Sequence, residues 1–348
     1  MKRLLTFLSS CSALVGSAAL ACSFHNYVPR PTMVDRLLNT EHIVLARADP
    51  DDPLRFQPLQ ALEGEADLVD LPFLVDAATR QRLNADPQAK VLFTRDGAYG
   101  EWLRVAYVDA EMSAVLNTVM EHRDAWQIGE DDDRFATFAG YLDHPDRAVR
   151  HLALRELDRA DYGVLRQLDP KVDTANTLSA LSDPAEADLV PIRYLLLGLA
   201  GDAALEQKLR AGLSDSLNRQ NGVLGAKTVA LLELGGAARA EELARSFLSN
   251  SDVPLADREM MVEAFALLSI YGAPDMQVAV RTSVAAAIQA APDIGAPVAR
   301  QFGGRGDWSM HETLEAAVRD RRVTSPLEVI LLSQYVAIAN ETLEPGSN

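Results

Sequence analysis

Histidine and cysteine are the residues to test first for catalysis, because a nucleophile–base pair and most zinc sites require them. Cysteine occurs only twice, at positions 11 and 22, which is too few for a disulfide framework or a four-cysteine zinc site. The sequence contains no Gly-x-Ser-x-Gly or His-Glu-x-x-His motif. The six histidines are scattered singly: His25, His42, His122, His144, His151 and His311. The sequence therefore predicts no catalytic, cofactor-binding or metal-binding residue.

Two acidic runs and one histidine-containing turn are the remaining candidates for a cation site. Residues 49–52 and 130–133 are acidic, but neither has the alternating oxygen ligands and central glycine of a calcium loop. We interpret them as a turn and a solvated linker. His144 lies beside Asp143 and near Asp146, and Asp146 is in position to cap the helix that follows. The expected role of this turn is therefore structural.

A stripe of four arginines along one predicted helix is the strongest candidate for binding. The helix spans residues 148–159 and has an apolar face opposite a charged one. Two interpretations remain open: an internal polar network that holds neighbouring helices together, or a docking site for an acidic partner protein. The candidate residues for protein binding are Arg147, Arg150, Arg155 and Arg159.

Residues 1–21 have the layout of a secretory signal peptide. Lys2 and Arg3 give a positive start, residues 4–20 are free of charge, and Ala-Leu-Ala ends the stretch. Several serines and a glycine make it only weakly apolar, which favours a cleaved signal over a membrane anchor. The sequence thus predicts export.

Cys22 would become the first residue of the mature chain. Small residues followed by cysteine resemble the lipobox of bacterial lipoproteins, in which this thiol carries a diacylglyceryl group, although Ala19 and Leu20 stand in exchanged order here. The resemblance makes Cys22 the lipidation candidate, and acylation would remove an otherwise unpaired thiol. By the same resemblance, Ser23 implies the outer membrane. The alternative is ordinary cleavage to a soluble periplasmic protein.

The charge balance excludes two classes of partner. The chain carries 50 acidic and 33 basic side chains, a formal net charge of −17. Nucleic-acid backbones and anionic lipid surfaces repel such a chain, so neither is expected to bind it. No stretch after the signal has the roughly 18 apolar residues that a membrane span needs. Membrane association is therefore expected only through a lipid on Cys22.

The length of 348 residues suggests about two domains, and the spacing of apolar residues changes near residue 110. After an N-terminal segment of residues 22–39, residues 40–110 have a period near two and predict a small β-rich domain. Its layout resembles the OB domains that follow the signal in some secreted proteins. Those domains carry paired cysteines that are missing here, so the resemblance implies a fold only.

The β-rich segment also predicts individual elements. Residues 90–94 and 101–108 predict a hairpin around Asp96-Gly97. Residues 54–62 predict a strand that pairs back on residues 42–48, and Pro58 restricts it to an edge. A short helix is expected over residues 75–84.

The rest of the chain reads as helices. Residues 111–130 predict a helix and an acidic linker, residues 131–343 predict helices almost throughout, and residues 344–348 form a tail. The pattern Asp146-x-x-Val149-Arg150-x-x-Ala153-x-x-x-Leu157 resembles the second helix of a HEAT-like repeat. The fold class expected is α+β, with a small β-rich, OB-like domain followed by an all-α HEAT-like solenoid. An ordinary globular all-α domain is the alternative for the helical part.

Similar helices recur downstream at a drifting period. The successive spacings between Val149, Val190, Leu224 and Val262 are 41, 34 and 38 residues, which is typical of stacked helical pairs. The expected pairs, as first and second helix, are 134–142 with 148–159, 174–181 with 189–199, 203–213 with 223–234, 237–248 with 258–271, and 275–290 with 308–320. A closing helix is expected over residues 326–341.

These observations predict an exported, non-enzymatic protein-interaction scaffold of the bacterial cell envelope, in the periplasm or on the outer membrane. Its partner would be a protein or peptide, and no cofactor is implied. Two alternatives remain open. One is an accessory protein or hydrolase with a site at the domain junction, using acidic pairs and His122. The other is a purely structural envelope lipoprotein.

Overall fold

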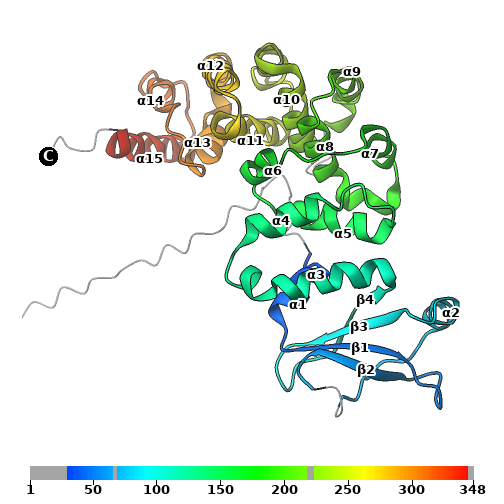
Figure 1. Cartoon of the computed structure of the whole chain (residues 1–348). Coiled ribbons are helices and arrows are strands. Elements are labelled where there is room, and N and C mark those ends of the chain that lie inside the picture. The colour runs from blue at the N-terminus through cyan, green and yellow to red at the C-terminus, as the bar shows by residue number, and fades with distance from the viewer. Residues whose placement is uncertain (1–29, 66–68, 218–222, 344–348) are drawn as a thin grey trace, which may run out of the picture.

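The computed structural model describes residues 30–65, 69–217 and 223–343. The predicted signal peptide, Cys22 and the tail of residues 344–348 lie outside the described residues. Within them, a four-stranded antiparallel sheet comes first and is followed by helices, which confirms the α+β class. In Figure 1 the sheet lies at one end, and the helices continue from it in a curved row to the C-terminal helix.

The sheet has the strand order β2-β1-β3-β4, so β1 and β3 are central. Its strands are β1 His42–Ala48, β2 Phe56–Glu63, β3 Lys90–Arg95 and β4 Leu103–Val108. The predicted hairpin is confirmed, because β3 pairs with β4 across a turn in which Gly97 has a φ of 61°. Pro58 lies in the edge strand β2, as predicted, opposite Ala46 of β1.

Alternate side chains of the central strands enter two different cores. Ile43 and Leu45 point into the large core, whose nearest helices are α1 (Met33–Asn39) and α3 (Ala110–Gln127). Val44 and Phe93 point the other way, into a smaller core that includes Leu83 of α2 (Ala77–Ala85). The sheet is therefore covered on both faces.

A chain of polar contacts joins α1 to the helices that follow. Arg123 of α3 donates from Nε to the carbonyl of Leu37 and from Nη2 to that of Thr40, at the C-terminal end of α1. The buried Arg134 donates to Asp35 of α1 at 3.0 Å and to Glu156 at 2.8 Å. The N-terminal segment expected over residues 22–39 thus includes a helix that the sequence analysis did not anticipate. The acidic linker is absorbed into the start of α4.

The helical part follows the predicted pairs closely up to residue 290. Its first helices are α4 Asp131–Ala139, α5 Arg147–Leu157, α6 Tyr162–Leu168, α7 Thr174–Ala180, α8 Val190–Leu199 and α9 Ala203–Ala211. It continues with α10 Val223–Leu243, α11 Leu255–Tyr271, α12 Pro274–Ala290, α13 Gly295–Gly303, α14 His311–Arg319 and α15 Pro326–Leu343. Short 3-10 segments occur at η1 Pro184–Leu189, η2 Ser214–Ser216 and η4 Pro292–Ile294, and a π segment, η3, at Ala244–Leu248.

The helices expected over 223–234 and 237–248 are confirmed: α10 and η3 cover both ranges, and Gly236, with a φ of 64° and a ψ of −158°, interrupts the helical backbone between them. Two other features of the helical part differ from the prediction. The fifth expected pair, 275–290 with 308–320, is interrupted by the unexpected helix α13. The short helix α6 was also not anticipated.

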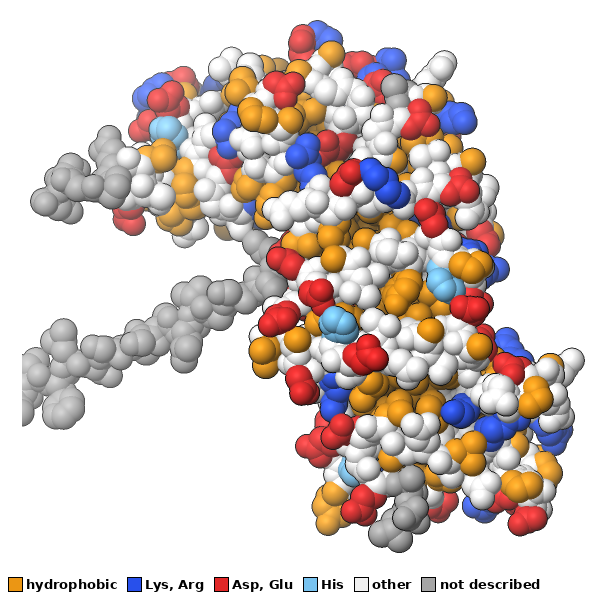
Figure 2. Space-filling model, in the orientation of Figure 1, with side chains coloured by type: hydrophobic (Ala, Val, Ile, Leu, Met, Phe, Trp, Pro, Cys, Tyr) orange, Lys and Arg blue, Asp and Glu red, His pale blue; other side chains and the backbone are white. Residues whose placement is uncertain are grey.

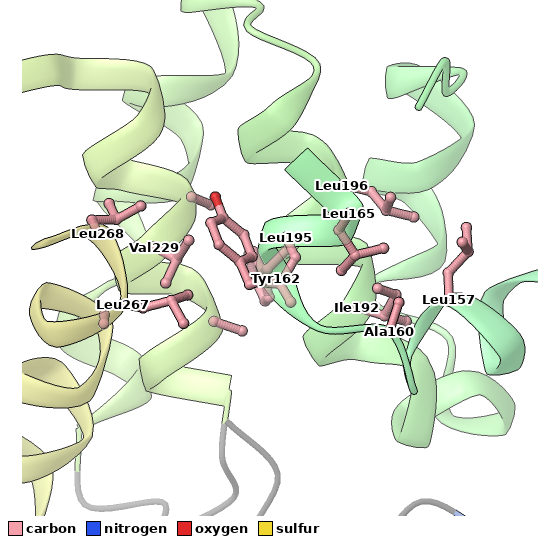
Figure 3. Packing of buried hydrophobic residues seen from close by; sticks show 14 of the residues in the cluster. Leu157, Ala160, Tyr162, Leu165, Ile192, Leu195, Leu196, Val229, Leu267 and Leu268 are labelled. Atoms are coloured by element: carbon pink, nitrogen blue, oxygen red, sulfur yellow. The ribbon is translucent and has the colours of Figure 1, made fainter. Parts of the chain in front are cut away.

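One continuous core runs through the molecule. Helices α5, α8, α10, α11, α13 and α15 contact one another in succession. The large core extends without a break from Leu45 in the sheet to Leu332 in α15. Figure 3 shows its middle, where Tyr162 and Leu165 of α6 lie between α8 and α11. Sequential contacts of this kind give each helix a neighbour on both sides, as stacked helical pairs require.

Candidate functional site

A polar cleft of about 300 Å³ opens between α5, α7, η1 and α8. Leu154, Thr177 and Leu196 are buried residues of its lining, whereas Asp143 and Asn176 are exposed. Its charged and imidazole side chains are Asp143, Arg147, Arg150, His151, Asp173, Asp183, Glu186 and Arg193. We call this feature the α5–α8 cleft.

Helix α5 brings two of the four predicted arginines into the cleft. Asp146 caps the helix, because its carboxylate accepts a hydrogen bond of 3.0 Å from the backbone N–H of Val149. This confirms the capping role expected from the sequence. Residues three and four apart share a helix face, so Arg147, Arg150 and His151 project on the side of the cleft while Val149 enters the core.

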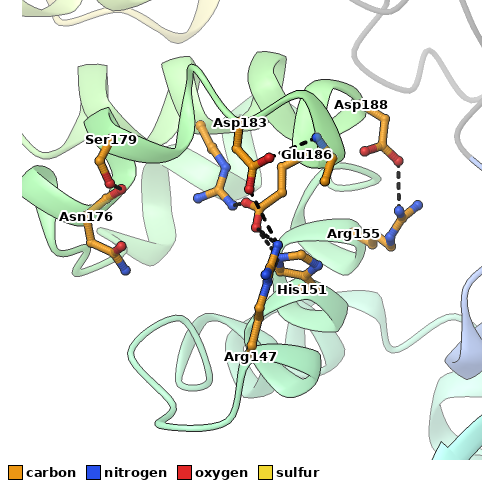
Figure 4. A network of polar contacts seen from close by, with 10 residues as sticks. Arg147, His151, Arg155, Asn176, Ser179, Asp183, Glu186 and Asp188 are labelled. Carbon is orange, nitrogen blue, oxygen red and sulfur yellow. Dashed lines mark hydrogen bonds and ion pairs between the residues drawn. The ribbon is translucent and has the colours of Figure 1, made fainter.

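Glu186 is the hub of the cleft's polar network (Figure 4). Its carboxylate accepts hydrogen bonds from Arg147 Nη2 at 2.7 Å and from Arg193 Nη2, and it lies 2.7 Å from His151 Nε2. Burial opposes ionisation of Glu186, but the hydrogen bond from His151 and the neighbouring positive charges outweigh it and hold the carboxyl pKa below its usual value. The Glu186 carboxylate is therefore occupied by contacts with Arg147, His151 and Arg193 of the protein itself.

Arg193 places a nearly buried cation in the wall of the cleft. The residue is 7% exposed and comes from the otherwise apolar helix α8. Burial lowers the pKa of Arg193, and the charges of Arg147 and Arg150 act in the same direction, against the attraction of Glu186. Its Nε atom is buried without a hydrogen-bond partner. The wall thus holds three guanidinium groups close enough to repel one another.

Arg150 differs from its neighbours in what it binds. Its Nη1 donates to two backbone carbonyls, those of His144 and Pro145, the latter at 2.7 Å. Among the ion pairs of the described residues, none joins Arg150 to a carboxylate. The carbonyl contacts hold the guanidinium in place without neutralising it, so Arg150 keeps its capacity for an acidic ligand.

A second hollow of about 500 Å³ continues the cleft along the surface. It shares Arg150 and Asn176 with the first and adds Lys171 and His144. Arg150 therefore lines both hollows.

Acidic side chains of the cleft cap helices or pair with arginines of the protein itself. Asp173 caps α7 through the N–H of Asn176 at 3.0 Å, and Asp183 caps η1 through the N–H of Ala185 at 2.9 Å. Asp183 also lies 3.5 Å from Arg147. Glu186 is occupied as well, and Asp143 and Asp173 are the exposed carboxylates of the lining. The acids of the wall therefore serve the fold more than they compete for a ligand at Arg150.

The other two predicted arginines lie outside the cleft. Arg155 pairs with Asp188 at 2.7 Å, and Arg159 lies 3.4 Å from Asp35 of α1. Arg155 links α5 to η1, and Arg159, just after α5, lies near α1, which fits the internal polar network, one of the two interpretations. Whether any of the four binds a partner stays a prediction.

Sequence reasoning missed Glu186 and Arg193, because they reach the cleft from η1 and α8. One signal was present: Arg193 interrupts the apolar run of residues 189–199. A cation on a buried helix needs an acidic partner nearby, and Glu186 is seven residues upstream.

The domain junction, proposed for the alternative hydrolase, is built differently. His122 Nδ1 lies 3.1 Å from Asp133 Oδ2, and Trp126 Nε1 donates to the same oxygen at 3.0 Å. Both contacts join α3 to α4. In the described part of the chain, no three His, Cys, Asp or Glu residues gather as a metal site would require.

Comparison with protein-family models, curated proteins and solved structures gives no match. The helices of the described ranges include none that is long and apolar enough to span a bilayer. The site is therefore interpreted from its own geometry.

Proposed function

We propose that this protein is an exported, non-enzymatic scaffold of the bacterial cell envelope, and that its α5–α8 cleft binds an acidic segment of a protein partner. The observation that carries the proposal is Arg150, a guanidinium that is held by backbone carbonyls and lines two adjoining hollows. Arginine recognises carboxylates with paired, charge-assisted hydrogen bonds. Arg147, at the rim, would extend the positive surface.

The proposal includes the HEAT-like repeat interpretation of the helices. Of the positions aligned in the sequence, Val149, Leu224 and Val262 are fully buried and Val190 is half-buried. Ion pairs between helices recur at separations close to the proposed period, such as Arg155–Asp188 and Arg239–Glu206, each 33 residues apart. A repeat stack presents side chains from successive helices on one surface, which suits an extended partner.

We propose only a positioning role for the β-rich part. Among the described strands, β2 and β4 are edges, and the closed barrel of an OB-like domain would need those edges to pair. The sheet shares its core with α1 and α3, and Arg134 ties α1 to α4 and α5. Such a base would hold the helical stack at a set distance from a lipid on Cys22.

Site-specific photo-crosslinking in the native envelope tests the binding site. A photoreactive residue in place of Asn176, which is exposed and lines both hollows, should crosslink to a discrete protein. The matched control is the same replacement at the exposed Glu315 of α14. The crosslink at position 176 should vanish when Arg150→Glu is added. An equal product at position 315, or one that survives Arg150→Glu, would contradict the proposal.

A further inference from the structure

Helix α15 has an apolar face that no described element covers. Leu332, Tyr335 and Ala339 are buried on its inner side, where it contacts α13 and α14. On the opposite side, Leu327 is 74% exposed, Ile330 56% and Ile338 47%. Figure 2 shows hydrophobic side chains at this end of the molecule. The helix is thus apolar on both faces.

The two ends of the helical row differ in how they are finished. At the sheet end, α3 contacts α4, α5 and β4, so the first helices of the row are covered. At the α15 end, the outer face carries the exposed side chains named above. Stacked helical repeats usually end in a unit with a polar outer face, because an apolar end would otherwise attract other molecules. The outer face of α15 departs from that rule.

The middle of the outer face of α15 is uncharged, and Glu341 is exposed at its C-terminal end. Residues 329–340 include no charged side chain, in a chain whose net charge is −17. Ile330 and Ile338 lie four positions on either side of Gln334, and all three are exposed on the same side of the helix. If two such helices pack antiparallel and centre on Gln334, Ile330 of each copy meets Ile338 of the other.

We infer that α15 is the contact between two copies of this chain, packed antiparallel about a two-fold axis at Gln334. The side-chain amide of glutamine is both donor and acceptor, so the two Gln334 residues can hydrogen-bond to each other across the axis. Two acidic chains repel each other elsewhere, and the uncharged stretch is where that repulsion is least. A two-fold contact of one face with itself closes at the dimer.

The size of the face predicts a weak dimer. A helix of 18 residues is about 27 Å long, and a strip about 10 Å wide gives an area on the order of 300 Å² per copy. That is well below the ~800 Å² per partner of a standard stable interface. We therefore expect a concentration-dependent equilibrium between monomer and dimer.

Sedimentation velocity from about 5 to 500 µM tests the contact. The wild-type chain should shift from monomer to dimer, and Ile330→Glu should stay monomeric throughout. Val278→Glu is the matched control, because Val278 is 64% exposed on α12, outside this face; it should leave the dimer unchanged. A wild-type monomer at every concentration, or an Ile330→Glu variant that dimerises normally, overturns the inference. Far-UV circular dichroism verifies that both variants fold.

Disulfide trapping tests the position of the axis. With both native cysteines replaced by serine, Gln334→Cys should oxidise to a covalent dimer, because a residue on the axis meets itself. Ser333→Cys is the control, since this neighbour points about 100° away around the helix. Equal trapping at both positions would exclude the antiparallel register, and so would no trapping at position 334.

Discussion

Arg300 of α13 binds both carboxylate oxygens of Glu259 in α11, at 2.8 Å each, although the two residues are 41 positions apart in sequence. The same two segments are joined by Arg305 and Glu263, 42 positions apart. These separations resemble the repeat offsets predicted from apolar residues alone. These two polar links therefore lie at separations close to the offset of 41 residues predicted between Val149 and Val190.

The two ion pairs should differ in their effect on stability, because their burial differs. Arg300 and Glu259 have side chains 43% and 30% exposed, whereas those of Arg305 and Glu263 are 13% and 10% exposed. Arg300→Met should lower the free energy of unfolding by about 1 kcal/mol or less. Arg305→Met should lower it by about 3 kcal/mol or more, because it leaves a carboxylate largely buried without its arginine. Urea denaturation measures both, and equal losses would refute the reasoning.

Close packing of α8 on α10 depends on Gly198. A Cβ on this residue would lie 2.7 Å from the Cα of Ala230, so the two helices would have to separate. Gly198→Ala should destabilise the protein by about 1–3 kcal/mol. Gly295→Ala is the control, since its nearest contact would be 3.4 Å from Leu332 and alanine favours the helix. The control should be neutral or stabilising; if both substitutions behave alike, the close approach is not what matters.

The network at Glu186 should give a defined acid sensitivity. The pKa of this carboxyl is held below its ordinary value of 4.5 in the folded state, so folding favours the ionised form. Its contribution is complete above pH 4.5 and is lost as the pH falls toward the folded-state pKa. The stability difference between wild type and Glu186→Gln should therefore shrink between about pH 5 and 3, a range below the usual histidine titration. Thermal or urea unfolding at these pH values measures it. A constant difference would exclude an ionic role for Glu186.

Cys22 provides the test of the predicted lipid anchor and cellular location. If the mature chain begins there with a lipid, mass spectrometry of the membrane fraction should find a diacylated or triacylated N-terminal cysteine. Cys22→Ser should move the protein from the membrane fraction to the soluble one, because the anchor is lost. An unmodified cysteine in the wild-type protein would leave export possible but end the lipoprotein interpretation.

Local signals allowed the sheet and most helices to be predicted. Asp96-Gly97 marked the hairpin, Pro58 marked an edge strand, and Asp146 marked the start of α5. One missed helix, α1, does have such a signal, a capping box formed by Thr32 and Asp35, which the sequence prediction did not use. Another lacks one. Helix α13 begins and ends with glycine and contains Pro297, residues that usually mark loops, and it is helical because it packs between α11 and α15. Gly236 marked the break between two helices, and its backbone is indeed non-helical there, with a φ of 64° and a ψ of −158°.

The candidate site was predictable only in part, since tertiary structure assembles it. Arg147 and Arg150 were apparent from their spacing on one helix. The sequence did not show that Arg155 and Arg159 lie outside the cleft, because the cleft depends on where α7 and η1 lie against α5. Asp188 and Asp35, which pair with the other two arginines, come from segments 33 residues downstream and more than 100 upstream.

Binding of the crosslinked partner to purified variants is the most direct test of the central claim, the acidic-ligand site at Arg150. Arg150→Met should weaken the affinity by about 10-fold or more, the usual worth of a charge-assisted hydrogen bond to a carboxylate. Arg155→Met, on the same helix but outside the cleft, should change the affinity by less than about 2-fold. Equal affinities for wild type and Arg150→Met, or equal losses for the two variants, would contradict the claim.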